Sequence, residues 1–571
     1  MLKIIFCSLT FMLIISTFKL SAGETISIDK FMYQVGNSHN LIIVNEDVSK
    51  INQQWKGTKS GILLDKHYDF ISPIQEVKIG KKYLVKNSSG IEYTLYFSSL
   101  PIIRITSPSR IVDEPRVMGE FTMSENSGNI LYSYIGVEYR GGASQEWEKK
   151  SFRLEFLLDT NIQITRDVSL LGMRDDDDWN LQAMFNEPLR IRNRSCFEIW
   201  DNIYTLPYKE EEPDAVAGIK MKYSDLFLNN EYLGIFAVGE RIDRKQLKLK
   251  KYKDGSIRGE LYKGAYWDEA TVYKSAPDYD NEDEFWSGYR YEYPKEEVDW
   301  KSFHAFIDFA INSDIPTFYE QYKDIFDINN AVDYFIFINL LTAFDNTGKN
   351  IYVARYDQNS TYFYLPWDMD GCFGTDWEGK IINNTTGKVY NTFYRRLVRD
   401  CENNGFNEKL KTRWNYLKQN VITEQAIMKI FRKNHDILYN NGAYEREEIA
   451  YEVYEYDEDH LDFISTWTNT RLQFLDNFFN EECIPAGVED NILTKDMKLY
   501  PNPAKRVLNF ESIEYPGTIF IEIYDVLGNK VFNDISSGEL RGIDLPNLSS
   551  GMYNLIIKYG KSLSTQKFII E

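Results

Sequence analysis

The chain has 571 residues, more than one hydrophobic core holds, so several domains are expected. Its formal net charge of −21 argues against nucleic acid and anionic membranes as bulk partners, because binding either one needs a positively charged face. Aromatic residues form 15% of the chain, and the 40 Tyr among them suit clefts and surfaces, where one end is apolar and the other forms hydrogen bonds.

The first 22 residues have the order of a secretory signal peptide. Lys3 supplies a positive charge, a mostly apolar run extends over residues 4–18, and Leu20-Ser21-Ala22 provides small residues for cleavage. The apolar run is shorter than the roughly 20 residues that a membrane span needs, and no later stretch approaches that length. We therefore predict a signal peptide over residues 1–22 and an exported protein with no transmembrane span; a buried N-terminal strand is the alternative.

Two small β domains are expected to flank a larger α+β domain. Residues 23–98 alternate short β-like runs with turns and predict a small β domain, which would serve as a scaffold or dock a substrate. Residues 99–480 begin with strands and continue with helices, which predicts the α+β domain. Residues 481–498 are expected to be a linker, and residues 499–571 predict a second β domain.

Individual elements of the central domain follow from its periodicity. Residues 225–228 and 232–238 are expected to pair as a hairpin through Asn229-Asn230-Glu231. A second hairpin is expected from residues 351–355 and 361–365. Apolar side chains at helical spacing predict helices over residues 189–200, 331–341, 407–420 and 461–479.

Four cysteines remain after removal of the signal peptide, at positions 196, 372, 401 and 483. They are scattered, none forms a CxxC pair, and the five His are far apart with no HExxH, so neither a zinc finger nor a His-based metal site has support. Export permits disulfides, but the sequence does not assign their pairing.

The residues between Asp345 and Gly371 carry the most informative pattern. Protein kinases place a catalytic carboxylate and a metal-binding amide five positions apart, and a second metal-binding carboxylate follows after a short hairpin. Asp345 and Asn350 have this spacing, and Asp368 follows the hairpin, with Asp370 beside it. Oxygen ligands without histidine suit Mg²⁺ or Mn²⁺. For Asp345, Asp368 and Asp370, the alternative is a role in turns that end or cap an element.

Several motifs of the central region resemble, in their order, the CotH family of atypical kinases, named after spore coat protein H. The resemblance covers roughly residues 100–480. Its motifs are Arg140-Gly141-Gly142-Ala143-Ser144, residues 149–156, Leu170-Leu171-Gly172-Met173, residues 177–181, Ile191-Arg192-Asn193, residues 230–236 with Glu240, and Pro366-Trp367-Asp368-Met369-Asp370. The spacing of Leu410, Arg413-Trp414, Leu417, Trp467 and Arg471 is similar to the helical half of that family.

The resemblance implies a kinase-like fold that binds ATP and a divalent metal, with Asp345 as the catalytic carboxylate. It implies metal ligands at Asn350 and Asp368, with Asp370 adjoining. Lys150, at the start of a strand, is the candidate cation for the phosphates; a solvated strand-edge charge is its alternative.

Three further features of the central domain remain open. Glu240 is expected to orient a lysine or bind metal, or else to form a surface ion pair, and Arg192 either stabilises the site or caps a helix. No GxGxxG loop is present, so residues 140–144 either replace it or form a turn. The acidic run 175–178 is either a metal site or a solvated loop.

The C-terminal region resembles the type A sorting domain of type IX secretion, found in Bacteroidota-type bacteria. The resemblance rests on Leu499-Tyr500-Pro501-Asn502-Pro503-Ala504, residues 523–531, Ile543-Asp544-Leu545, residues 548–553 and Lys567-Phe568-Ile569-Ile570. It implies a β-sandwich that the secretion translocon recognises, so that catalysis does not depend on it. A plain β-sandwich binding module is the alternative.

Three functions are compatible with the sequence. The first is an exported CotH-like protein kinase that transfers a phosphoryl group from ATP to a hydroxyl of an extracellular or surface protein. The second is a non-catalytic surface binding or adhesion protein on a kinase-like scaffold, favoured by the scarcity of ATP outside cells. The third, a glycoside hydrolase with two carboxylates, has no motif in its support.

Overall fold

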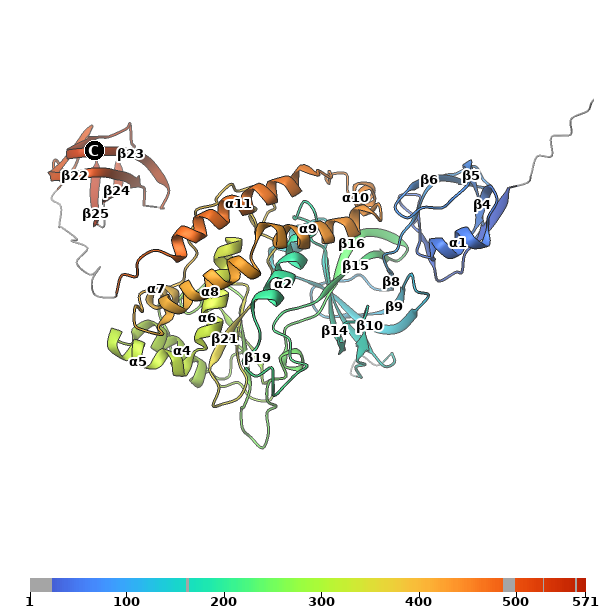
Figure 1. Cartoon of the computed structure of the whole chain (residues 1–571), viewed down its shortest axis with the longest axis horizontal. Coiled ribbons are helices and arrows are strands. Elements are labelled where there is room, and N and C mark those ends of the chain that lie inside the picture. The colour runs from blue at the N-terminus through green and yellow to red at the C-terminus, as the bar shows by residue number, and fades with distance from the viewer. Residues whose placement is uncertain (1–22, 161–163, 486–498, 527, 560–561) are drawn as a thin grey trace, which may run out of the picture.

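A computed structural model describes residues 23–160, 164–485, 499–526, 528–559 and 562–571 of the chain (Figure 1). The signal peptide predicted over residues 1–22 and residues 486–498 of the predicted linker lie outside the described residues. In the described part, no helix combines the length and the apolar character that crossing a membrane requires.

The N-terminal region forms one seven-stranded sheet, in the order β1-β4-β5-β6-β7-β3-β2, with helix α1 (Val48–Gln54) beside it. Burial alternates along β6, where Tyr83 and Val85 point into the core and the residues between them face solvent. The strands are β1 Glu24–Ser27, β2 Tyr33–Val35, β3 Leu41–Val44, β4 Lys59–Leu63, β5 His67–Ile74, β6 Lys82–Asn87 and β7 Glu92–Phe97.

A closed barrel follows, in the strand order β10-β11-β14-β16-β15-β8-β9. Its interior is filled by apolar side chains from every wall, among them Phe121, Leu154 and Trp179, so the barrel is a packed core. Its strands are β8 Ile102–Thr106, β9 Val117–Ser124, β10 Ile130–Arg140, β11 Ser151–Leu157, β14 Asp178–Gln182, β15 Met221–Leu228 and β16 Glu231–Gly239. Between them lie η1 (Ala143–Glu146) and the short pair β12 (Val168–Ser169) and β13 (Asp175–Asp176).

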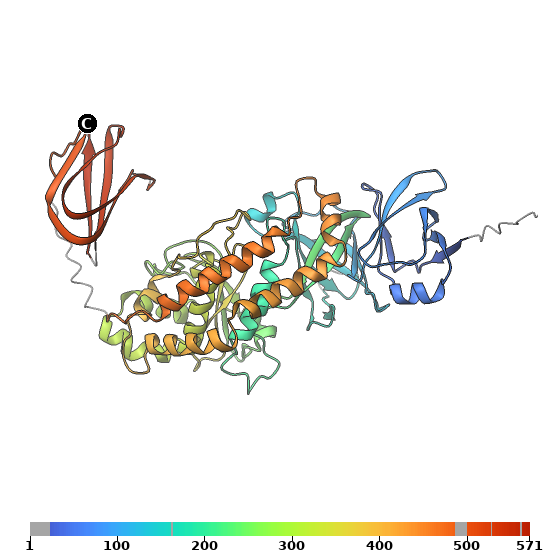
Figure 2. The same ribbon diagram turned by 45° about the horizontal axis from the view of Figure 1, so that its top comes forward.

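The second half of the central domain is a five-stranded sheet, ordered β18-β19-β17-β20-β21, surrounded by helices. Helix α6 (Ile328–Leu341) is buried from Asn330 to its end, and α9 and α11 run side by side along the helical half (Figure 2). The strands are β17 Glu260–Gly264, β18 Phe285–Trp286, β19 Tyr289–Tyr293, β20 Ile351–Arg355 and β21 Tyr362–Pro366. The other helices are α2 Arg192–Ile203, α3 Arg244–Leu247, α4 Lys301–Asn312, α5 Ile315–Ile325, η2 Asp345–Thr347, α7 Thr392–Leu397, α8 Phe406–Asn420, α9 Glu424–Tyr439, α10 Ala443–Ala450 and α11 Asp459–Phe479.

Helix α10 joins the helical half to the barrel through buried charges. Arg446 donates to both carboxylate oxygens of Asp225 on β15, with Nη2 2.9 Å from each. Glu447 pairs with Lys149 Nζ at 2.7 Å and Arg190 Nε at 3.2 Å, and all these side chains are buried. Burial raises the pKa of Glu447, but Lys149 and Arg190 outweigh it and hold the pKa below its usual value.

The N-terminal sheet is attached to the same helix and to the barrel. Tyr96 on β7 donates its hydroxyl to Glu445 of α10 at 2.6 Å, and the backbone amide of Ser99 donates to Asn441 at 2.6 Å. Arg104 on β8 donates to the carbonyl oxygens of Phe31 and Tyr33. Polar contacts and a shared apolar cluster thus join this domain to the barrel and to α10.

The C-terminal region has a core of its own and consists of four antiparallel strands. Hydrogen bonds join them into one sheet, ordered β23-β22-β24-β25, so the described residues do not divide into the two separate sheets that a β-sandwich implies. The length of β22 and β23 explains the difference, since each pairs along most of its length with the other. The strands are β22 Val507–Tyr524, β23 Lys530–Asp544, β24 Gly551–Tyr559 and β25 Ser562–Ile570.

Replacing Glu447 with Gln tests the buried charge cluster. Loss of the carboxylate leaves Lys149 and Arg190 buried without their counter-ion, so the free energy of unfolding should fall by about 3–5 kcal/mol. Urea unfolding followed by tryptophan fluorescence measures this, because residues 499–571 contain no Trp and contribute no signal. Glu452→Gln, at an exposed position nearby, should change nothing; equal stability of both variants would contradict the analysis.

Candidate active site

An acidic pocket of about 140 Å³ lies where the end of α6 meets the segment after β21. Four carboxylates, Asp345, Asp368, Asp370 and Asp376, contribute to its wall. The other residues that line it are Thr342, Ala343, Phe344, Asn346, Gly371, Gly374, Thr375, Trp377, Ile382 and Asn384. The pocket therefore combines oxygen donors with an apolar rim.

Asp345 reaches the pocket because α6 ends just before it. Thr342 takes a left-handed conformation (φ 55°) at the C-terminus of α6, and the chain then turns through η2. Asn346, the next residue, donates from Nδ2 to the carbonyl oxygens of Asn350 and Trp367, each at 2.7 Å. These two hydrogen bonds hold the Asp345 loop against the segment that carries Asp368.

The segment after β21 is held by the start of α2. Asn193 accepts a hydrogen bond from the backbone amide of Met369 at 3.2 Å, and Arg192 donates from Nε to the carbonyl oxygen of Cys372 at 3.1 Å. Asp368 itself is exposed and has a left-handed backbone (φ 56°), a conformation that non-glycine residues adopt infrequently. The backbone thus turns so that Asp368 points away from the core.

The pKa values of two carboxylates in the pocket, Asp345 and Asp370, are raised. Burial and the charge of Asp368 raise the pKa of Asp370 to about 7. The pKa of Asp345 is raised mainly by burial; Lys349 lowers it and Asp368 raises it further. Among the described residues, no lysine or arginine forms an ion pair with Asp345, Asp368 or Asp370. The pocket is therefore short of positive charge.

The donor set fits a hard divalent cation such as Mg²⁺ or Mn²⁺. Carboxylate oxygens of Asp368 and Asp370 and amide oxygens nearby are the ligands that these ions prefer, and a cation would relieve the repulsion that raises the pKa of Asp370. The three carboxylates Asp345, Asp368 and Asp370 do not converge within 4.8 Å as another acidic group does. An ion here would take part of its coordination from substrate or water.

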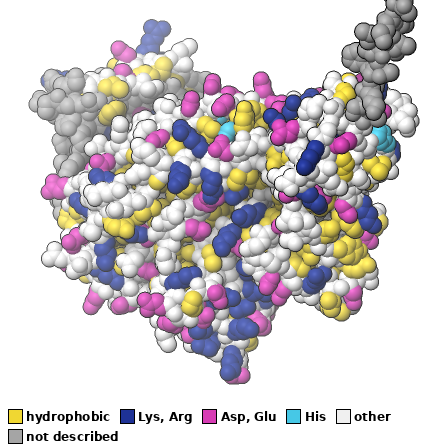
Figure 3. Space-filling view, turned by 45° about the vertical axis from the view of Figure 1, so that its right-hand side comes forward, with side chains coloured by type: hydrophobic (Ala, Val, Ile, Leu, Met, Phe, Trp, Pro, Cys, Tyr) yellow, Lys and Arg dark blue, Asp and Glu magenta, His cyan; other side chains and the backbone are white. Residues whose placement is uncertain are grey.

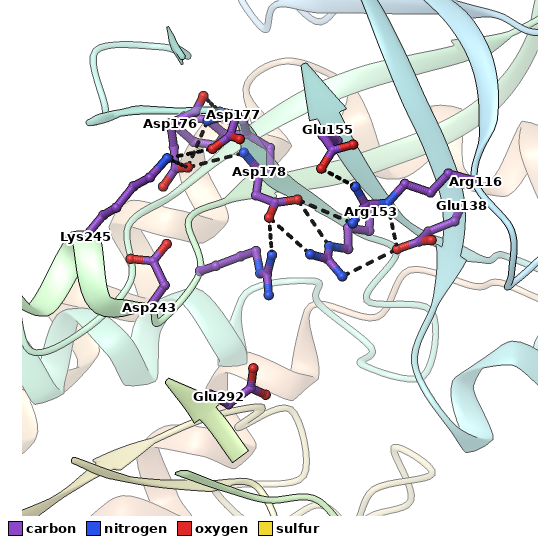
Figure 4. Close-up of polar contacts among 12 residues, drawn as sticks. Arg116, Glu138, Arg153, Glu155, Asp176, Asp177, Asp178, Asp243, Lys245 and Glu292 are labelled. Carbon is purple, nitrogen blue, oxygen red and sulfur yellow. Dashed lines mark hydrogen bonds and ion pairs between the residues drawn. The ribbon is translucent and has the colours of Figure 1, made fainter. Parts of the chain in front are cut away.

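That other acidic group consists of Asp167, Asp176 and Asp177, and it overlaps the acidic run 175–178 of the sequence. Lys245 Nζ lies 3.2, 3.3 and 2.6 Å from oxygens of these three residues, respectively; Figure 4 shows it beside Asp176 and Asp177. Because an ammonium already holds the three carboxylates together, the structure favours an ion-pair cluster over a metal site here.

The remaining predicted site residues lie outside the wall of the acidic pocket. Asn350 contributes its backbone, which donates to Gly264 O at 2.9 Å and accepts from Trp367 N at 3.0 Å. Lys150 donates to the carbonyl oxygens of Gln145 and Trp147, both at 2.6 Å, and so shapes the loop after β10. Glu240 accepts from the backbone amides of Lys220 and Arg174, which ties it to structure. Arg192 is buried against Glu187, 2.5 Å away.

A second set of charges lies where the end of β10 meets the five-stranded sheet. Arg140, the last residue of β10, and Lys263 on β17 both lie over the indole ring of Trp367, directly before Asp368. No motif marks Lys263. We call this set, with Arg153, Arg241, Arg290, Asp178 and Glu292, the cationic cleft; Figure 4 shows Arg153 paired with Asp178 at its barrel side.

Asn193→Ala tests whether α2 positions the segment from Asp368 to Cys372, which we expect to bind a divalent metal. The variant removes the acceptor of the Met369 amide and frees the turn between Asp368 and Asp370, so Mn²⁺ affinity should fall about tenfold. Calorimetric titration with Mn²⁺ measures this. Asn407→Ala, on α8, which loses a hydrogen bond from Nδ2 to the Val398 carbonyl oxygen, is the control. Unchanged affinity in a folded Asn193→Ala would contradict the prediction.

Comparison with known proteins places this geometry in a family. The family model "CotH kinase protein" matches residues 137–475, which is more than half of the chain. Inner spore coat protein H of Bacillus subtilis (strain 168) is 22% identical over 274 residues, covering 47% of this chain and 67% of that protein.

Residues 498–571 match the secretion system C-terminal sorting domain. This domain directs export through type IX secretion, so the protein is secreted or displayed at the outer cell surface. With more than half of its length matched, including the segments that build the acidic pocket, the chain belongs to the CotH kinase protein family.

Proposed function

We propose that this protein is an exported kinase that uses ATP and Mg²⁺ or Mn²⁺ to phosphorylate a protein hydroxyl. The observation that carries the proposal is the position of Asp368. Asp368 lines the acidic pocket together with Asp345. It directly follows Trp367, whose indole ring is contacted by Arg140 and Lys263 of the cationic cleft. Phosphoryl transfer needs a carboxylate for the acceptor, oxygen ligands for metal and cations for phosphate, and these three lie next to one another.

Asp345 is the group that receives or orients the proton of the acceptor hydroxyl. Its raised pKa makes it a better proton acceptor than an ordinary carboxylate, since basicity follows pKa. Asp368 and Asp370 would hold the metal, with Asn350 as the third predicted ligand, and the metal would supply charge that stabilises the phosphates. Asn193 and Arg192 keep this segment in place.

The second candidate, a non-catalytic surface binding protein, is favoured by the rim of the pocket. Phe344, Trp377 and Ile382 line the pocket and are 49%, 51% and 45% exposed, which is unusual for large apolar side chains that lie together. On the face shown in Figure 3, basic, acidic and hydrophobic side chains are interspersed. The exposed rim suits a polypeptide as acceptor or as ligand.

ATP binding by the mature chain separates the two candidates. Titration with ATP in the presence of Mn²⁺ should show binding, and removal of the metal with a chelator should weaken it. Asp368→Asn should lose metal-dependent binding because a charged ligand is gone. Asp357→Asn is the control, since this carboxylate lies in the β20–β21 turn and pairs with Arg258 at 2.9 Å.

Asp345→Asn completes the test. Substitution of the proton acceptor should leave ATP and metal affinity within about twofold but lower phosphoryl transfer roughly 10²–10⁴-fold, the usual contribution of a general base. Transfer of labelled γ-phosphate to the protein itself or to an extracellular protein fraction measures this. Absence of ATP binding with either metal would overturn the kinase proposal and favour the binding protein.

Removal of residues 499–571 should separate export from chemistry. The C-terminal domain has its own core, so ATP affinity of the shortened chain should equal that of the mature chain. In cells, the shortened chain should remain in the periplasm, whereas the full chain reaches the surface or medium. Fractionation and immunoblotting measure this; surface display without the domain would contradict the assignment.

A further inference from the structure

Two cations of the cationic cleft lack a counter-ion. The guanidinium carbon of Arg140 is 5.7 Å and the ammonium of Lys263 is 5.4 Å from the centroid of the Trp367 indole ring. Lys263 also lies 5.6 Å from the ring centroid of Tyr352. Both side chains are half-buried. Within the residues that the structure describes, neither forms an ion pair or a hydrogen bond.

Their neighbours behave differently. Arg153 and Arg241 both pair with Asp178, and Arg290 pairs with Glu292. Each of these arginines therefore has a carboxylate partner, as charges in a crowded cleft normally do. The two unpaired cations are the ones that lie nearest to Trp367, so positive charge is left over at one place in the cleft.

The surroundings of Arg140 and Lys263 disfavour their positive charge. Burial lowers the pKa of Lys263 to about 8, and Arg290 and Arg140 lower it as well, against the opposite effects of Glu292 and Asp368. Burial likewise lowers the pKa of Arg140, with Asp368 opposing. Trp367 and Tyr352 are only 5% and 4% exposed, so the aromatic walls limit the water that could solvate the cations.

We propose that Arg140 and Lys263 form an oxyanion site against Trp367 that holds the polyphosphate chain of the nucleotide. The proposal rests on the proposed kinase function and assigns to these residues the task that the sequence predicts for Lys150. Two separated cations suit a chain of several phosphates better than a single carboxylate, and guanidinium groups bind phosphate oxygens well. The chain would end beside Asp368, where the metal is expected.

The contacts of Lys150 make it unsuited to binding the phosphates. Its ammonium already donates hydrogen bonds to two carbonyl oxygens, those of Gln145 and Trp147, within the loop that follows Arg140. Lys150 thus shapes the loop between β10 and β11, and Arg140 stands at the start of that loop. In this proposal, the motif Arg140-Gly141-Gly142 supplies the positive charge of Arg140 to the phosphates, and its glycines do not form a loop that covers them.

Tripolyphosphate tests the site without metal and without a nucleoside. The mature chain, in chelator, should bind tripolyphosphate, and binding should weaken at least tenfold in Lys263→Met and in Arg140→Met, while Lys263→Arg retains it. Lys250→Met is the matched control, because Lys250 also lies over a tyrosine ring, 4.7 Å from that of Tyr356, but pairs with Glu212 at 3.0 Å. Thermal unfolding verifies that each variant is folded.

The same variants titrated with ATP and Mn²⁺ identify the source of the phosphates. Parallel losses of ATP and tripolyphosphate affinity in Lys263→Met support the proposal. Full ATP affinity in folded Lys263→Met and Arg140→Met overturns it while the kinase function stands. Tripolyphosphate binding through Lys263 in a protein that binds no ATP overturns the nucleotide assignment together with the kinase function. Absence of tripolyphosphate binding to the unmodified chain also overturns the proposal.

Discussion

The buried charges of helix α10 are the constraint on which the rest of the central domain depends. Glu447 has no contact with solvent and is satisfied by Lys149, Arg190 and the backbone amide of Ile235. Arg446, the preceding residue, is satisfied by Asp225 on the barrel. Charges removed from water in this way are tolerated only when every partner stays in place, so the barrel and the helical half must meet in one arrangement.

Short stretches of chain connect these buried charges to the candidate active site. Lys149 stands at the end of the loop that begins with Arg140, and Arg190 stands two residues before Arg192. Arg192 and Asn193 in turn hold the segment from Asp368 to Cys372. The loop after Arg140 and the start of α2 are therefore both anchored to Glu447, through Lys149 and Arg190. This anchoring explains how loops without regular structure can hold the side chains of the site in place.

Local patterns in the sequence are sufficient to predict much of this fold. The two hairpins and the helices later observed as α6, α8 and α11 follow from periodicity and turn residues. The proximity of Asp345 and Asp368 was also predictable, because only one hairpin separates them in the chain. Membership in the CotH family and the sorting domain were also predictable, since their motifs are contiguous.

Contacts between residues far apart in the chain could not be predicted from the sequence. Lys263 reaches Trp367 because β17 pairs with β20, and no local signal announces this pairing. Lys149 and Lys150 look alike in the sequence, yet neighbouring residues point in different directions, so one binds Glu447 and the other two carbonyl oxygens. Similarly, four scattered cysteines permit several pairings, of which the structure forms Cys401–Cys483, with Cys196 and Cys372 free and buried.

The Cys401–Cys483 disulfide gives the exported protein a mechanical property. Cys483 lies just after α11 and before the sorting domain, whereas Cys401 lies just after α7, 82 residues earlier. Any tension applied to the chain beyond Cys483 would otherwise act first on the last turn of α11. The covalent bond transfers that load to the interior of the helical half, so the terminal helix is not peeled from α6 and α9 when the chain is pulled from its end.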